Sequence, residues 1–126
     1  MNTWIKIFII AALYMHVSGC AHSDPWTKTD TALYTAYVGT LAYDAHPTSE
    51  IRHYPCLQES GWVAKQVLGS QPDAASSWQY MGTLAITNYF IARSLPSTWR
   101  KVWLGGNTFE HGRAAFNNDK LFDRGC

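Results

Sequence analysis

The sequence predicts an all-α protein, a small bundle of about four helices that follows a short apolar leader. After the leader, apolar side chains recur at intervals of three and four residues, as they do on the buried faces of helices. Prolines and glycines divide the chain into helix-length segments, and no segment alternates apolar and polar residues as a half-buried strand would. With 126 residues and no internal repeat, the chain fits a single helical domain over residues 27–126.

The first helix is expected over residues 27–44. Asp24 and Pro25 offer a cap and a first-turn proline, while Thr27 followed by Asp30 offers an alternative start of the capping-box type. Pro47 is expected to end the helix, because the residue before a proline avoids the α region. The side chains that share its apolar stripe are Leu33, Tyr37, Leu41 and Asp44.

Three further helices are expected. The second covers residues 57–69 and stops at Gly69, and the third lies between Pro72 and Pro96. The fourth covers residues 97–119 and is weakened at Gly105-Gly106, and the tail after it is irregular. Residues 74–92 carry no charge and are nominally long enough to span a membrane, but their several polar side chains favour a buried helix of the bundle.

The leader has the pattern of a secretory signal. Lys6 precedes an apolar run over residues 7–17, which is too short to cross a bilayer, and two small residues follow. The stretch "VSGC", which ends at Cys20, resembles the lipobox of bacterial lipoproteins, whose cysteine is acylated after the signal is cut before it. It therefore predicts a signal peptide over residues 1–19 and a lipidated Cys20 with its tether over residues 20–26. The alternative is an ordinary signal peptide that happens to contain a cysteine.

Ala21 follows the cysteine where retained lipoproteins have aspartate. The resemblance to the sorting pattern of Gram-negative lipoproteins therefore implies the periplasmic face of the outer membrane, with the inner membrane as the alternative. An exported chain folds in an oxidising compartment, and its remaining cysteines, Cys56 and Cys126, form an even pair. We expect a disulfide between them; two free thiols are the alternative.

The charge balance argues against nucleic-acid binding. The ten Lys and Arg side chains include Lys6 of the leader, so the mature chain has nine basic and nine acidic side chains and no basic stripe. No nucleophile elbow, zinc-protease helix, paired-cysteine motif or phosphate loop is present, so the sequence indicates no catalytic activity and no cofactor.

Asp44 is the candidate site residue, because it is an acid on an apolar stripe and must find hydrogen-bond donors in the core. We expect a buried polar network that links it to other helices, with His111 as a further candidate partner. The members of this network are Asp44, Thr48, Asn88, Glu110 and Asn117. The alternative is an active-site carboxylate pair formed by Asp44 and Glu110.

A metal site is the weaker hypothesis for the loop after the first helix. His46, His53 and Cys56 lie close to Asp44 in the sequence, and zinc accepts such ligands. Their spacing matches no compact zinc site, so these side chains are expected on a surface loop and no metal is predicted.

The mature chain resembles a small family of bacterial and phage-encoded lipoproteins or membrane-associated proteins. The matching pieces are Trp26-Thr27, Asp30-Thr31-Ala32-Leu33, Ala36-Tyr37, Asp44 with Thr48, Leu68-Gly69 with Pro72, Leu95-Pro96 with Arg100, and Glu110 with Asn117. The chain lacks the acid and the Asn-Pro pair that the family usually has before Leu68-Gly69. The resemblance implies a helical envelope protein and supplies no reaction.

Together these patterns predict a lipid-anchored envelope protein with a binding or structural role. Its expected partners are the membrane, through the lipid, and another envelope protein. One alternative is a phage or prophage accessory protein that excludes superinfecting phage or assists lysis. Another is a small hydrolase that uses Asp44 and Glu110.

Overall fold

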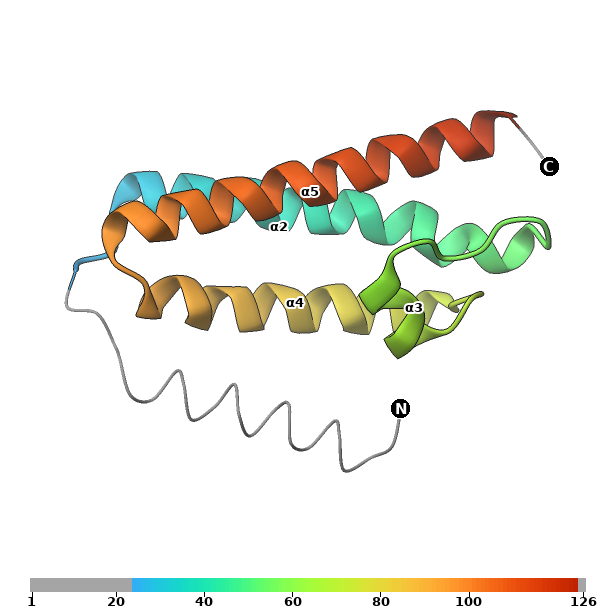
Figure 1. Cartoon of the computed structure of the whole chain (residues 1–126), viewed down its shortest axis with the longest axis horizontal. Helices are drawn as coiled ribbons and strands as arrows, with labels where there is room; N and C mark the ends of the chain where they lie inside the picture. Colours follow the sequence, from blue (N-terminus) through green and yellow to red (C-terminus); the bar gives the residue numbers. More distant parts are fainter. Residues whose placement is uncertain (1–23, 125–126) are drawn as a thin grey trace, which may run out of the picture.

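The computed structural model describes residues 24–124, and four α-helices and one 3-10 turn make up this part of the chain (Figure 1). Helix α2 spans Lys28–Glu50, η1 Ile51–His53, α3 Trp62–Leu68, α4 Ala74–Ser94 and α5 Ser97–Arg124. No strand occurs between residues 24 and 124. The predicted all-α bundle is therefore confirmed.

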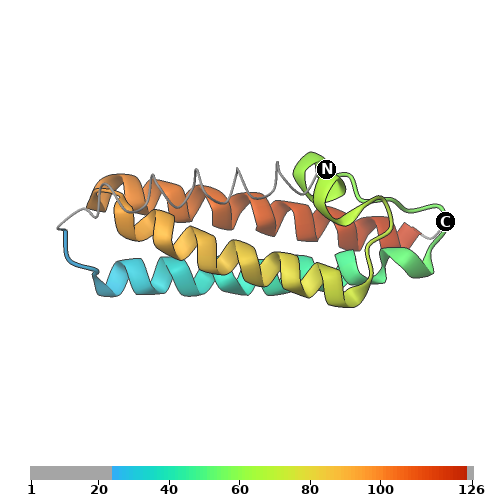
Figure 2. The same cartoon turned by 90° about the horizontal axis from the view of Figure 1, so that it is seen from below.

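Helix α2 is the centre of the bundle. It lies alongside α5 for most of its length and also packs against α4, whereas α4 and α5 touch each other over a short stretch only (Figures 1 and 2). The short helix α3 lies at the end of the bundle where α4 begins (Figure 1). Because α4 and α5 touch so little, side chains and the segment before α3 line the space between these two helices.

The core is small and is tied together by polar groups. Tyr37 is fully buried, and its hydroxyl accepts a hydrogen bond of 2.7 Å from the side-chain amide of Asn88. The carbonyl oxygen of the same amide accepts from Trp103 Nε1 at 2.8 Å. Asn88 on α4 thus joins α2 to α5, and a buried amide with its partners satisfied fixes how three helices fit together.

Helix α2 begins at a capping box. Thr27 Oγ1 accepts from the backbone N–H of Asp30, and Asp30 Oδ2 accepts from the backbone N–H of Thr27 at 2.8 Å. Of the two predicted starts, the one at Thr27 is therefore the correct one. The carboxylate of Asp24 instead accepts from Ser97 N at 2.9 Å, at the first residue of α5.

Asp30 and Arg100 form an ion pair that is fully removed from water. Arg100 Nη1 lies 3.0 Å from Asp30 Oδ2, and both side chains are 0% exposed. Burial acts to raise the pKa of Asp30, but the hydrogen bonds from Thr27 and the Arg100 guanidinium together outweigh it and hold this pKa below its usual value. The folded state therefore favours the ionised carboxylate.

All five N–H groups of Arg100 are used. Besides Asp30, they donate to backbone carbonyls of two segments: Ala92 and Leu95 at the end of α4, at 2.9 and 3.1 Å, and Asp24 and Pro25 before α2, each at 3.2 Å. The guanidinium therefore joins the last carbonyls of α4 to the segment that leads into α2.

Three expected boundaries are wrong. Helix α2 continues past Pro47 to Glu50, because the missing N–H costs one hydrogen bond while Pro47, Thr48 and Ser49 are all buried by continuing. Helix α5 passes through Gly105-Gly106 and includes the tail to Arg124, because α2 supports it along most of its length. Helix α3 begins at Trp62 rather than at residue 57.

The other expected boundaries agree with the structure. Gly69 ends α3 at a φ of 87°, which favours glycine, and α4 lies between Pro72 and Pro96 with Asp73 as its cap. Over residues 24–124, no helix is both long enough and apolar enough to cross a membrane. Cys20 and Cys126 lie outside the described residues, so the lipid attachment and the Cys56–Cys126 disulfide stay predictions.

We expect Arg100→Ala to lower the free energy of unfolding by about 3–5 kcal/mol, because it leaves the buried charge of Asp30 without its partner. Arg113→Ala is the matched control, since the Arg113–Glu110 pair is more than half exposed, and it should cost at most about 1 kcal/mol. Urea unfolding followed by circular dichroism measures both. Equal losses in the two variants would contradict the role assigned to the buried pair.

Candidate functional site

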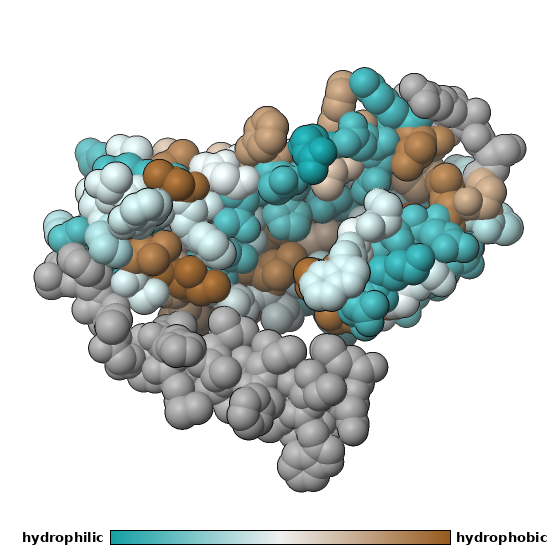
Figure 3. All heavy atoms as spheres, in the orientation of Figure 1, coloured by the Kyte–Doolittle hydropathy of each residue, from teal (hydrophilic) through white to brown (hydrophobic). Residues whose placement is uncertain are grey.

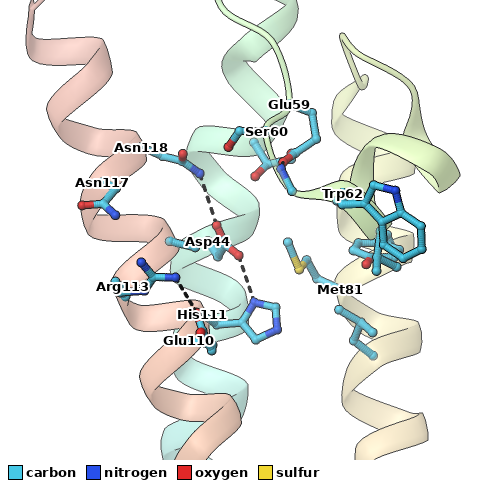
Figure 4. Close-up of a pocket in the computed structure, with 17 residues that line it drawn as sticks. Asp44, Glu59, Ser60, Trp62, Met81, Glu110, His111, Arg113, Asn117 and Asn118 are labelled. Atoms are coloured by element: carbon cyan, nitrogen blue, oxygen red, sulfur yellow. Dashed lines mark hydrogen bonds and ion pairs between the residues drawn. The ribbon is translucent and has the colours of Figure 1, made fainter.

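A cleft of about 650 Å³ opens between α2, α4, α5 and the segment that leads into α3 (Figure 4). Asp44 and Thr48 contribute to it from α2, and Tyr80, Met81 and Leu84 contribute from α4. Residues 59–64 line it from the segment before α3 and from the start of that helix. The limited contact between α4 and α5 explains why this space is not filled by the core.

Asp44 lies at the centre of the cleft wall and is buried (Figure 4). Its Oδ2 is 3.0 Å from Nδ1 of His111, and its Oδ1 accepts from the amide of Asn118 at 3.4 Å. Both partners come from α5, so this acid connects the central helix to its main neighbour. Because a carboxylate only accepts, Nδ1 of His111 is the donor in this pair and Nε2 is left on the far edge of the ring.

The ring of His111 is held on two sides. It makes an edge-on contact with the ring of Tyr37, with the ring centroids 5.9 Å apart. On the other side, the hydrogen bond between Nδ1 and Asp44 fixes the rotation of the imidazole. The side chain is 21% exposed, so the imidazole is partly accessible from the cleft. An oriented imidazole of this kind can bind a ligand by hydrogen bonds or exchange a proton with it.

Glu59 is a second buried acid of the cleft, on the loop before α3. Its Oε1 accepts from the backbone N–H of Gly61 at 2.7 Å. Burial raises the pKa of Glu59, and the negative charge of Asp44 raises it further, while the N–H groups of Gly61 and Ser60 oppose the shift. Burial likewise raises the pKa of Tyr80, with the charges of Glu59 and Asp44 adding to it.

An exposed aromatic side chain lies beside these polar groups. Trp62 is 77% exposed, and it lies on the side of the cleft away from Arg113 and Asn117 (Figure 4). Val63 next to it is also exposed. A large apolar side chain in water at the edge of a cleft gains free energy when a ligand or a partner covers it.

The structure brings together only part of the predicted polar network. Asp44 and Thr48 are buried and face the cleft. Asn88 is buried too, but it bonds to Tyr37 and Trp103 in a separate network.

Glu110 and Asn117 also line the cleft, but both are exposed, so the prediction that they belong to a buried network is wrong. The error is one of helical register: Leu104, His111 and Ala115 form the inner face of α5, which places Glu110 and Asn117 on its flank. Glu110 pairs with Arg113 at 3.0 Å on the surface. No hydrogen bond or ion pair joins it to Asp44 in the described part of the chain, so the hypothesis of a carboxylate pair has no support.

Sequence reasoning missed Glu59, Trp62 and Asn118 as parts of the site. Nothing in the sequence distinguishes Glu59 and Trp62 from surface residues of a short helix, and the loop conformation alone brings them to the cleft. One signal could have identified the inner face of α5: Leu104, His111 and Ala115 recur at helical spacing. Asn118 follows His111 by seven residues and so lies on the same face.

The potential metal ligands at the end of α2 and in the segment after it point to solvent, and His46 lies within the helix rather than on the expected loop. His46, His53 and Cys56 are exposed, and within residues 24–124 no three side chains of the ligating types lie close enough together to hold a metal ion.

No protein-family model matches the chain, and comparisons with curated proteins and with solved structures find no match.

We expect Asp44→Ala to lower the free energy of unfolding by about 1–3 kcal/mol, because it removes the acceptor of His111 and Asn118. Urea unfolding at neutral pH measures the loss. Glu110→Ala is the matched control on α5, and it should stay close to wild type because Glu110 is exposed. An Asp44→Ala protein as stable as wild type would show that the pair does not contribute to folding.

Glu59→Gln tests the buried carboxyl. The variant keeps an oxygen that accepts from Gly61 and removes the charge. The raised pKa means that the folded state favours the neutral carboxyl of Glu59. The stability that this carboxyl contributes is present below its unfolded pKa and is lost as the pH rises through its folded pKa. Calorimetry should therefore show a larger gain in Tm for Glu59→Gln at pH 7 than at pH 4. Equal gains at both pH values would contradict the raised pKa.

Proposed function

We propose that this protein is a lipid-anchored protein of the bacterial cell envelope that binds a ligand or a partner in the cleft around Asp44. The anchor rests on the sequence, which has a basic start, a short apolar run and the lipobox-like "VSGC" at Cys20. The binding role rests on the cleft, which is the observation that carries the proposal.

The cleft has the features of a binding site. A volume of about 650 Å³ is in the range of sites for small molecules or short peptide segments. Its walls combine apolar side chains such as Met81 and Leu84 with a few directed polar groups, namely Asp44, His111 and Glu59. The exposed ring of Trp62 adds an aromatic surface of the kind that contributes most to binding when it is covered.

Binding is favoured over catalysis by the partners of the polar groups. Asp44 orients His111, as an acid orients an imidazole base in many enzymes, but no hydroxyl or thiol among the described residues is hydrogen-bonded to this imidazole. The acids are held by structural hydrogen bonds with Asn118 and with the Gly61 backbone. The groups are therefore suited to recognise a ligand and to orient it.

The anchor would also determine where the cleft lies. Asp44 follows Asp30 by fourteen residues on α2, and at 1.5 Å per residue it is about 20 Å further along the helix axis. A domain held by a lipid before Asp24 would thus present the cleft to molecules near the membrane surface.

We expect radiolabelled palmitate to enter the wild-type protein in bacterial cells and not to enter Cys20→Ala. The reason is that the thiol of Cys20 is the only site of the thioether-linked lipid in a lipobox. Cys56→Ala is the control for a cysteine elsewhere in the chain, and it should be labelled as strongly as wild type. Equal labelling of the wild-type and Cys20→Ala proteins would refute the anchor.

Binding in the cleft is tested by a photoreactive amino acid placed at Trp62 or, as the control, at Trp78. Both side chains are exposed, but only Trp62 lines the cleft. We expect irradiated cells to give a discrete adduct at position 62 that weakens when His111→Ala is added, and none of the same mass at position 78. The same adduct at both positions, or no adduct at position 62, would contradict the proposal.

A further inference from the structure

The end of the bundle opposite the cleft has a surface that the binding role leaves unexplained. We propose that this end, where α2 begins, α4 ends and α5 begins, inserts into the interface of the membrane that carries the lipid of Cys20. We call it the tether end and define it by Trp26, Phe90, Arg93, Trp99 and Val102. The inference rests on the proposed anchor and adds a second, non-covalent contact with the bilayer.

The described chain enters the bundle at this end and is fixed there. Figures 1 and 2 show the segment before α2 at the end of the bundle where α4 ends and α5 begins. The carboxylate of Asp24 accepts from Ser97 N at 2.9 Å, and the carbonyls of Asp24 and Pro25 accept from Arg100. Asp24, the first described residue, is thus bonded into the folded domain.

The length of the tether leaves this end little freedom to leave the membrane. Three residues separate Cys20 from Asp24. Even fully extended, the four steps from Cys20 to Asp24 span at most about 14 Å. If the acyl chains of Cys20 lie in the bilayer, Asp24 stays within that distance of the lipid surface, and the bundle end that holds Asp24 meets the interface.

Large apolar side chains at the tether end are in water. Trp99, Val102 and Phe90 are 64%, 58% and 52% exposed, and they come from the first turns of α5 and the last turns of α4. Apolar patches are visible towards this end on the face drawn in Figure 3. Burying them in an interface lowers the free energy, and tryptophan is enriched at the depth of lipid headgroups.

Trp26 lies in an aromatic and basic cluster beside them. Its ring centroid is 5.4 Å from that of Tyr89, and the guanidinium carbons of Arg93 and Arg100 lie 5.6 and 5.3 Å from its ring. Such rings combine an apolar body with a polar edge, which suits the boundary between acyl chains and headgroups.

The charges at this end favour anionic lipids over a second copy of the chain. Lys28, Arg93 and Lys101 are exposed and basic, and no acidic residue occurs from residue 74 to residue 109. The two carboxylates of the region, Asp24 and Asp30, are hydrogen-bonded within the bundle. In a symmetric dimer these basic groups would face each other and repel, whereas anionic headgroups would attract them.

The test uses the lipidated protein, purified from membranes and placed in phosphatidylglycerol-containing vesicles whose acyl chains carry bromine. Brominated chains quench only those tryptophans that reach the bilayer. We expect the quenched fraction of the fluorescence to fall about twofold in Trp99→Phe, because Trp99 inserts. Trp62→Phe is the matched control: Trp62 is 77% exposed but lies at the cleft, so the quenched fraction should not fall.

The outcomes separate the inference from the anchor on which it rests. The mass of the same preparation reports whether Cys20 carries acyl chains. A lipidated protein in which Trp99→Phe leaves the bromine quenching unchanged overturns the membrane contact and keeps the anchor. A protein without the lipid whose Trp99 is quenched when vesicles are added refutes the anchor and keeps the contact. If Trp99 is shielded both from bromine and from aqueous iodide, a protein surface covers it and the inference is overturned.

Discussion

The bundle depends on the buried ion pair between Arg100 and Asp30. A guanidinium out of water is tolerated only when its charge and all of its N–H groups have partners, and Arg100 meets this requirement at one point in the fold. Its partners are the first turn of α2, the last carbonyls of α4 and the backbone of Asp24 and Pro25. Because Arg100 itself is in the first turn of α5, one side chain determines how three helix ends and the incoming chain meet.

The cleft exists because α2, α4 and α5 are held together at the Arg100 end of the bundle and are less closely packed at the Asp44 end. Beyond Arg100, the bridge from Tyr37 through Asn88 to Trp103 still connects α2, α4 and α5. Further along, the core side chains become small, as at Ala45 and Ala115, and α4 touches α5 little. Polar pairs such as Asp44 with His111 then take the place of apolar packing, and the loop before α3 forms the remaining wall.

The sequence predicts the features that depend on local periodicity and misses those that depend on distant partners. The all-α class, the inward position of Asp44 and the capping signal at Thr27 follow from spacing alone. Arg100 does not, because four of its five hydrogen bonds go to backbone carbonyls that only the tertiary structure assembles. The position of Glu110 does not follow from spacing either, because packing against α2 selects the face of α5 that contains Leu104 and Ala115. The local rule that ends a helix before Pro47 takes no account of the burial of Thr48, which offsets the lost hydrogen bond.

The two ends of the bundle respond to acid in different ways. The pKa of Asp30 is lowered and a guanidinium does not lose its charge in proteins, so the pair at the tether end stays ionised to a lower pH than a free aspartate would. The pKa of Glu59 is raised, so as the pH falls this carboxyl takes up its proton before Asp30 does. Protonation removes a negative charge beside Asp44 while the rest of the fold keeps its ion pair. The charge of the cleft can therefore change with pH without loosening the end of the bundle that the tether enters.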